Sequence, residues 1–452
     1  WGAYESEDFA GSLGIEDGSQ PVKVTYGYSK DRRGDLKQIM FGSLVSRDGG
    51  VPLYGKALDG NRSDSQSAAE FFMKVRSLVR DPAEVCCVAD SKGWCAPVLD
   101  VIAREGLRLL SRLPRNHRIH REVMELEASE VRVVERPPRT SNGEPDRYEI
   151  LGVDIEEVLT LDEPHGEGTR RRTIRVPARA VRVFSTRLWR KKIASLAGTR
   201  AQERKNAVKN IRTWQAEAHV CRADAERAAL RHTTDHTYVT LDFTATLRRV
   251  EGPLQRGRGR PRKNPEPHLA HDHYRVDYEW HDVPQAESEE RLREAATFVL
   301  IRTRSKGWHI DDADLIDRYK GQYHNEHGFA WLKSGAANKG LNPIFLENPQ
   351  RIEALCFVYL IGLTIWALIQ RTVRAHLVAH ETGLPYHRNK PSAHITTRFF
   401  FELFPKVQTV PYRRNGGSWQ KKLVAFDDVR ALACRALGTP LTAFNPVIEN
   451  SA

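Results

Sequence analysis

The order of short apolar segments in the first quarter of the chain constrains the fold most strongly. Two segments of strand character, residues 36–46 and 51–57, are joined by a turn rich in glycine, which predicts a β-hairpin. The next segments alternate: a helix over 65–79, a strand ending at Asp90, a helix over 96–105 and a strand over 107–113. This order predicts a mixed α/β sheet. The strand ending at Asp90 is almost wholly apolar, so we expect it to be buried on both faces.

The character of the sequence changes after Pro114. Charge-rich segments of strand character follow, together with a basic helical stretch over 191–230, and we expect them to form a second, β-rich region. An apolar strand returns over 296–305, and a single helix is expected over 311–333. The last hundred residues are expected to be mostly helical. One helix should begin at Asn348, which is followed by a proline at the first helical position.

Composition indicates the class of partner. The 452 residues are 40% hydrophobic and carry 70 Lys and Arg against 58 Asp and Glu, a formal charge of +12. A polyanionic partner is therefore favoured, above all nucleic acid.

The six cysteines show no CxxC spacing, which argues against a zinc site or a disulfide framework and favours a reducing cytoplasm. The longest apolar run, 355–369, is too short to span a bilayer, so we expect a buried helix and no membrane.

One polar segment contains an ordered set of functional groups. Offsets of three, seven and fourteen from Tyr319 bring Gln322, Glu326 and Lys333 within about 60° of one another on a helix. One helix face would then present an aromatic ring, an amide, a carboxylate and an ammonium group. The alternative is a solvated face with a stray charge pair.

Asp90 is the second acidic residue of interest. A charge at the end of a buried strand is unusual, and the ends of strands beside a cleft are where α/β sheets bind ligands. Together, Asp90 and Glu326 are hard oxygen ligands that suit Mg²⁺, for which Mn²⁺ can substitute. The alternative for Asp90 alone is the N-cap of a helix.

These features resemble the DDE transposases of bacterial insertion sequences, in the subgroup with a Tyr-x2-Arg-x3-Glu-x6-Lys signature. The signature corresponds to Tyr319, Gln322, Glu326 and Lys333 with its spacing intact, although Gln322 stands where the family has arginine. The resemblance covers most of the chain. It extends to residues 26–38, 52–64 and 342–355 and to Asp90 in "VADS".

The resemblance implies a ribonuclease H-like α/β fold interrupted by a β-rich insertion domain. Residues 1–114 and 296–340 would form the two parts of the catalytic domain, 115–295 the insertion, and 341–452 a helical C-terminal region. Asp90 and Glu326 would be the second and third catalytic acids. The first acid has no good match, because Asp17, Asp31 and Asp35 do not end an apolar strand. We expect it upstream of Trp1, and therefore expect this chain alone to have little activity.

The implied reaction is Mg²⁺-dependent cleavage of double-stranded DNA at the element ends, followed by attack of the freed 3′-hydroxyl on target DNA. Pairing two ends implies at least a homodimer. The implied location is the bacterial cytoplasm, in association with the nucleoid. Lys333 would clamp the terminal phosphate, and Tyr319 would stack or hydrogen-bond there.

Three further segments are candidate DNA contacts. Arg258, Arg260 and Arg262 lie in "RGRGRPRK", which looks like an AT-hook for the minor groove; the alternative is a basic linker. Residues 187–214 would present a cationic flank as a helix, or simply a solvated one. Lys30 and Arg33 precede the first hairpin strand and can touch DNA, with a solvated turn as the alternative.

Four alternatives remain open. His324 and His327 flank Glu326 but lack the HExxH pattern of a zinc site. A nuclease on the same fold would cut DNA without joining it, and a catalytically inactive transposase remnant would only bind it. Trp94, just past Asp90, can contact a displaced base or, more commonly for tryptophan, pack in the core.

Overall fold

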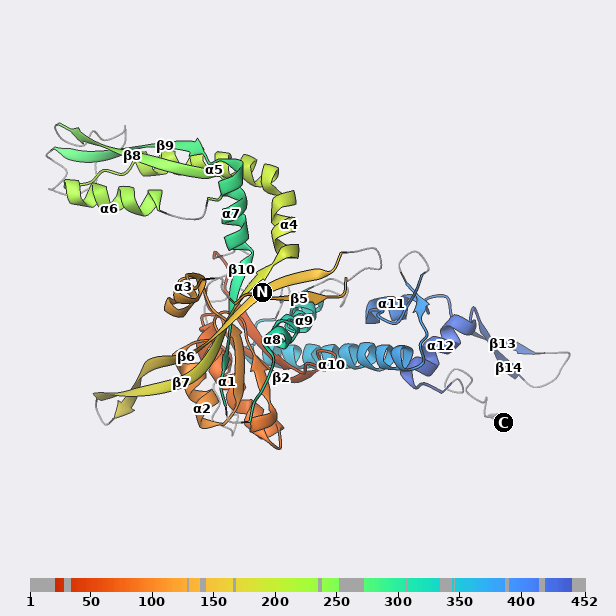
Figure 1. The fold of residues 1–452 in the computed structure, drawn as a ribbon. Helices are drawn as coiled ribbons and strands as arrows, with labels where there is room; N and C mark the ends of the chain where they lie inside the picture. The colour runs from red at the N-terminus through yellow and green to blue at the C-terminus, as the bar shows by residue number, and fades with distance from the viewer. Residues whose placement is uncertain are drawn as a thin grey trace.

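The computed structural model describes residues 21–27, 34–127, 130–138, 144–165, 168–234, 238–251, 272–305, 307–333, 344, 346–386, 390–413 and 419–440. These residues form a central body, an arm that rises from it, and a C-terminal region at the far end of a long helix (Figure 1). The candidate site belongs to the body.

The body begins with the predicted hairpin and helix. β1 (Ile39–Val45) pairs antiparallel with β2 (Pro52–Asp59). α1 (Asp64–Leu78) follows, and its N-cap Ser63 accepts a hydrogen bond from the backbone N–H of Gln66. The short 3-10 helix η1 (Pro82–Glu84) then leads into the central sheet. The predicted hairpin and helix are confirmed, but among the described strands the hairpin forms its own two-stranded sheet and does not join the mixed sheet.

A six-stranded mixed sheet lies at the centre of the body, in the order β3-β4-β10-β7-β6-β5. Its strands are β3 (Cys86–Val88), β4 (Arg108–Arg112), β5 (Arg132–Arg136), β6 (Asp146–His165), β7 (Gly168–Ser185) and β10 (Thr297–Thr303). β3 and β4 are parallel, whereas the other neighbours are antiparallel. The predicted mixed α/β class is confirmed. β5, β6 and β7 come from the charge-rich sequence after Pro114, and they join the same sheet as β3 and β4.

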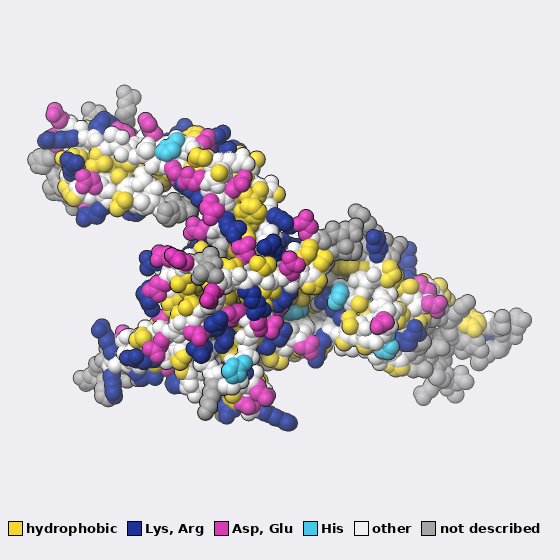
Figure 2. All heavy atoms as spheres, viewed as in Figure 1, with side chains coloured by type: hydrophobic (Ala, Val, Ile, Leu, Met, Phe, Trp, Pro, Cys, Tyr) yellow, Lys and Arg dark blue, Asp and Glu magenta, His cyan; other side chains and the backbone are white. Residues whose placement is uncertain are grey.

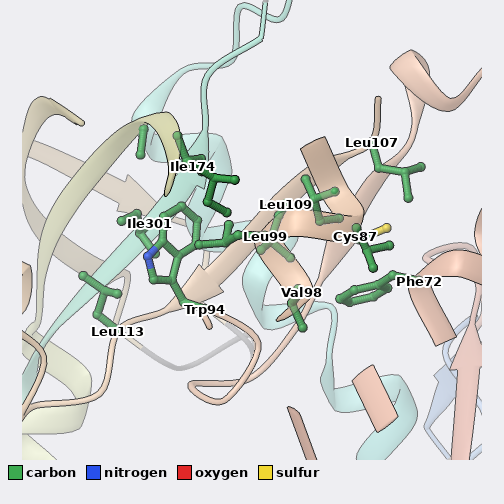
Figure 3. Packing of buried hydrophobic residues seen from close by; sticks show 14 of the residues in the cluster. Phe72, Cys87, Trp94, Val98, Leu99, Leu107, Leu109, Leu113, Ile174 and Ile301 are labelled. Atoms are coloured by element: carbon green, nitrogen blue, oxygen red, sulfur yellow. The ribbon is translucent and has the colours of Figure 1, made fainter. Parts of the chain in front are cut away.

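Helices cover both faces of this sheet. α2 (Ala96–Arg104) and α3 (Arg118–Met124) lie with α1 on one face, and α8 (Asp312–Lys320) lies on the other. Figure 3 shows part of the first core, including Phe72, Cys87, Trp94, Val98, Leu99, Leu107, Leu109, Leu113, Ile174 and Ile301. Trp94 is 4% exposed, so the packing alternative for this side chain is confirmed.

β3 is less enclosed than its sequence predicts. Cys87 is buried in the first core, but Cys86 and Val88 on the opposite face are only half-buried. β3 has only three residues and lies at the edge of the sheet, beside β4 alone among the described strands. An edge strand leaves one side open, and an apolar run does not reveal which strand will be the edge.

The arm leaves the sheet after β7 and returns at β10 (Figure 1). Its elements are α4 (Thr186–Ala194), α5 (Leu196–Gln215), α6 (Arg222–Thr233), the hairpin of β8 (Leu241–Val250) with β9 (His273–Asp282), and α7 (Gln285–Ala295). The basic stretch predicted over 191–230 is mostly helical, but it is divided into three helices, because Ser195 both ends α4 and starts α5 and a further break precedes α6. Trp214 forms an aromatic cluster at the centre of the arm with Phe243 and Tyr278.

The C-terminal region is built on α10 (Pro349–Ala379). This helix starts as predicted, since Oδ1 of Asn348 accepts a hydrogen bond from the N–H of Gln350. The prediction that its apolar run is buried is wrong: Val358 is 62% exposed and Ile365 54%. Hydrophobicity alone does not show how many faces of a helix are covered. The smaller elements are β11 (Leu384–Pro385), β12 (Pro391–Ser392), α11 (Thr397–Glu402), β13 (Gln408–Arg413), β14 (Trp419–Val424) and α12 (Asp428–Leu437).

Candidate active site

The signature segment forms two helices rather than the single helix predicted. α8 ends with Gly321 as its C-cap, and α9 (Tyr323–Lys333) begins after a short junction. The N–H of Gln322 donates to the carbonyl of Tyr319, a three-residue spacing typical of 3-10 turns at helix ends. Tyr319 therefore lies on α8, Gln322 lies in the junction, and Glu326 lies in the first turn of α9.

Asp90 lies in a tight turn directly after β3. Its Oδ1 accepts a hydrogen bond of 3.0 Å from the N–H of Lys92, and its backbone carbonyl accepts one of 2.6 Å from the hydroxyl of Ser111 on β4. The N-cap of the next helix is Cys95, so the capping alternative for Asp90 is wrong. The turn fixes an exposed carboxylate at the edge of the sheet.

The carboxylates of Asp90 and Glu326 act on the same phenol, that of Tyr319. Burial raises the pKa of Tyr319, and the charges of Asp90 and Glu326 raise it further. The guanidinium of Arg112 opposes this shift by its charge and by a hydrogen bond to the phenol oxygen. Tyr319 is therefore protonated at neutral pH and can donate its O–H. Two acids from distant parts of the sequence thus face one region of the structure.

Arg112 is the member of this group that sequence reasoning missed. β3 and β4 are parallel, with Val88 opposite Leu110, so Asp90 and Arg112 follow the same end of neighbouring strands. The guanidinium of Arg112 also lies over the ring of Phe298, at 5.3 Å from its centroid. The signal that was available is the one used for Asp90: a charged residue at the end of an apolar strand.

Gln322 contributes a hydrogen-bond donor with no partner. Its Nε2 is buried and donates no hydrogen bond in the structure. An unsatisfied buried donor costs about 1–3 kcal/mol. A ligand acceptor, such as a phosphate oxygen, would relieve this cost. The amide of Gln322 is therefore a further candidate for contact with DNA.

The hairpin of β1 and β2 packs against α9, the helix that carries Glu326. Gly50 in the hairpin turn has a φ of +67°, and a Cβ there would lie 2.7 Å from Cβ of His324. The rings of Phe41 and Phe329 pack edge to face, with centroids 6.4 Å apart. Glycine therefore serves two needs here, the left-handed backbone and the close approach to α9.

The donor set suits a hydrated hard cation. Asp90 and Glu326 supply exposed carboxylate oxygens. Mg²⁺ usually keeps several waters and relies on one or two carboxylates plus substrate phosphates. In the part of the chain that the structure describes, no group of three or more His, Cys, Asp or Glu side chains forms a potential metal site. The two acids therefore fit Mg²⁺ only in company with water and substrate.

Several predicted DNA contacts lie outside the described residues. These are Lys30 and Arg33 before the hairpin, and Arg258, Arg260 and Arg262 in the segment between β8 and β9. Lys333 is the last residue of α9, but its side chain is not among those described.

A basic face on α5 is the clearest cationic surface in the arm. Lys205, Lys209 and Arg212 are spaced by four and three residues and are exposed, so they share one side of the helix. Among the described residues none of the three forms an ion pair, whereas Arg204 nearby is paired with Asp282. Elsewhere, Figure 2 shows basic and acidic side chains interspersed over the body and arm. Unpaired lysines and arginines are the groups that phosphates can engage.

Two recesses in the structure lie away from the candidate acids. One lies at the base of α7 and includes Glu149, Arg182 and Arg291, and the other lies on the arm beside Trp280. Asp90 and Glu326 are instead on open surface, which a long polymer can reach. No protein-family model and no curated protein matches this chain.

Proposed function

We propose that this chain is a DDE-type DNA transposase that cleaves and joins DNA strands with the help of Mg²⁺. The observation that carries the proposal is that two exposed acids, Asp90 after β3 and Glu326 in the first turn of α9, lie close enough to Tyr319 for both charges to raise its pKa. The order of hairpin, helix, strand, helix and strand supports a ribonuclease H-like catalytic domain. The arm between β7 and β10 supports an insertion within that domain.

Each residue has a distinct role in this proposal. Asp90 and Glu326 would hold Mg²⁺, which would supply activation of the attacking oxygen and stabilisation of the leaving oxygen in phosphoryl transfer. Tyr319 donates its O–H to a phosphate oxygen of the DNA. Arg112 adds positive charge beside the phenol and the phosphate. Gln322 donates its unpaired amide hydrogens to the phosphate backbone of the DNA.

The arm supplies non-specific affinity for DNA. Lys205, Lys209 and Arg212 can each neutralise a phosphate, which makes binding depend steeply on salt. The AT-hook-like segment with Arg260 at its centre joins β8 to β9, so it would act from the same arm. In this proposal the partner is double-stranded DNA in the bacterial nucleoid, and two copies bring two element ends together.

The test uses supercoiled plasmid DNA and an oligonucleotide with a free 3′-hydroxyl, in Mg²⁺ or Mn²⁺. The chain should nick and join weakly, because the first acid of the resembled family has no match in it, and both reactions should be lost in Asp90→Asn and in Glu326→Gln. The matched control is Glu84→Gln, which neutralises an exposed acid just before β3. Nicking without joining would identify a nuclease. DNA binding with neither reaction in any version, together with Mn²⁺ binding that is unchanged in Asp90→Asn and Glu326→Gln, would overturn the catalytic proposal and identify a protein that only binds DNA.

A further inference from the structure

α10 has an uncovered apolar face along its whole length. One set of its exposed positions alternates at spacings of three and four residues, and its members are Ala354, Val358, Ile361, Ile365, Leu368, Thr372, Ala375 and Ala379. We call this set the outer stripe. Four of its members are large or branched apolar side chains at its centre, and Ile361 and Leu368 are 45% and 40% exposed.

The spacing of the outer stripe is that of a coiled coil. Alternating steps of three and four residues average 3.5, which keeps a stripe facing one partner helix. Val358, Ile365 and Thr372 are β-branched and occupy one heptad position, and Ile361, Leu368 and Ala375 occupy the other. α10 has 31 residues and is therefore roughly 46 Å long, enough for the three to four heptads that a coiled coil needs.

The opposite face of α10 is already packed against the protein. Cys356, Leu363 and Leu377 are buried there. Oε1 of Glu353 accepts a hydrogen bond of 2.8 Å from the N–H of Val22, and Nε of Arg374 donates one of 2.8 Å to the carbonyl of Ile395. These contacts fix the helix in the fold and leave the outer stripe exposed, together with Phe357 and Val378 beside it.

A lipid partner is the main competitor for this surface. By length and composition α10 would pass as a helix that can cross a membrane. However, Arg371 forms an ion pair with Asp48, and Arg374 is half-buried against the C-terminal region. Burying these arginines and their partners in hydrocarbon would be costly. A protein surface that matches the stripe avoids this cost.

We propose that the outer stripe pairs antiparallel with the outer stripe of a second copy of this chain. An antiparallel pair centred on Ile365 places Arg351 of each helix opposite position 379 of the other, beside Glu381. Both residues are exposed, and Glu381 has no ion pair among the described residues. A parallel pair would instead bring Arg351 against Arg351. Charge complementarity at the ends and the opposed helix dipoles therefore favour the antiparallel arrangement. The inference does not rest on the proposed function, because it concerns association without DNA.

The first experiment measures the mass of the purified full chain by sedimentation over a range of concentrations, without DNA. The wild type should be a dimer. Ile361→Lys or Ile365→Lys should raise the dissociation constant of the dimer at least tenfold. Both sites are exposed, so the monomer should still fold, which circular dichroism checks. Leu230→Lys on α6 is the control, since Leu230 is a helical residue that is 64% exposed, more than Ile361 or Ile365.

The second experiment tests the orientation by charge reversal. Arg351→Glu alone should weaken the dimer several-fold, because it places two acids together at each end. Adding Glu381→Arg should restore the wild-type dissociation constant. Failure of this rescue would overturn the antiparallel arrangement.

Three further results would overturn the inference itself. One is a wild-type chain that remains monomeric at every concentration. Another is a dimer that Ile365→Lys does not weaken. The third is a monomer that binds vesicles of phosphatidylcholine and phosphatidylglycerol through the same stripe, which would assign the surface to lipid.

Discussion

The hydroxyl of Ser43 on β1 donates a hydrogen bond of 2.8 Å to Oδ1 of Asn325 on α9. Asn325 is the residue immediately before Glu326, so this bond fixes the first turn of α9 against the hairpin. The hairpin and β3 belong to separate sheets among the described strands. The position of Glu326 relative to Asp90 therefore depends on how α9 packs on the hairpin as well as on the central sheet.

Tyr319→Phe should slow DNA strand cleavage without weakening DNA binding or folding. The ring stays in the core, and only the hydroxyl between Arg112 and the carboxylates is lost. A hydrogen bond to a charged group contributes about 1.5–3 kcal/mol, so cleavage should fall about ten- to a hundredfold. Plasmid nicking measures this rate. Tyr26→Phe removes an exposed hydroxyl and should change nothing; an unchanged rate in Tyr319→Phe would remove the phenol from the mechanism.

Gln322→Arg should strengthen DNA binding. The amide stands where the resembled family has arginine, and its Nε2 has no partner. A guanidinium there can reach a phosphate, which should steepen the slope of log K against log salt by about 0.9. Fluorescence anisotropy with a labelled duplex at several salt concentrations measures the slope. Binding that is equal or weaker, with an unchanged slope, would show that this position does not face DNA.

Neutralising the basic face of α5 should weaken DNA binding for all sequences alike. Replacing Lys205, Lys209 and Arg212 by Gln should lower the salt slope by about 0.9 per lost phosphate contact. Lys406→Gln, an exposed lysine of the C-terminal region, is the control for net charge. If the triple variant and the control have the same slope, the face of α5 is only a solvated helix surface.

The stability of the fold should fall in mild acid, in part through His324. Burial lowers the pKa of His324 below its ordinary value of 6.5, Arg374 and His327 lower it further, and Asp48 opposes them. Between the lowered pKa and about 6.5 the unfolded chain binds more protons than the folded one. This stabilisation is therefore complete above about pH 6.5 and is lost as the pH falls.

Urea unfolding at several pH values measures this effect. His324→Asn should reduce the loss in the free energy of unfolding between about pH 7 and pH 5. His309→Asn, at an exposed histidine, should keep the wild-type pH dependence. An identical pH dependence in His324→Asn would show that this histidine titrates normally in the fold.

Local patterns predicted the elements of the body well. The hairpin, α1, α2 and β4 are specified by turn chemistry and by apolar spacing within each segment, so each could be derived from its own residues. The break between α8 and α9 could not. Gly321 lies inside a helical pattern, where glycine costs only about 1 kcal/mol and does not by itself predict an end.

The contacts between residues from distant parts of the chain were the hardest to predict from the sequence. Asp90 and Glu326 could be chosen separately by residue type and context. Their convergence on Tyr319 depends on how α8 packs across the sheet, and the inclusion of Arg112 depends on the parallel pairing of β3 with β4. The exposed face of α10 was missed for a related reason, because the composition of a helix does not say which neighbours cover it.

The most direct test of the central claim is the binding of Mn²⁺, as a paramagnetic substitute for Mg²⁺, followed by electron paramagnetic resonance. If Asp90 and Glu326 share one site, Asp90→Asn and Glu326→Gln should each weaken Mn²⁺ binding at least tenfold, and Glu84→Gln should bind like the wild type. Equal binding by all four proteins, or binding lost in only one of the two site variants, would contradict a shared site.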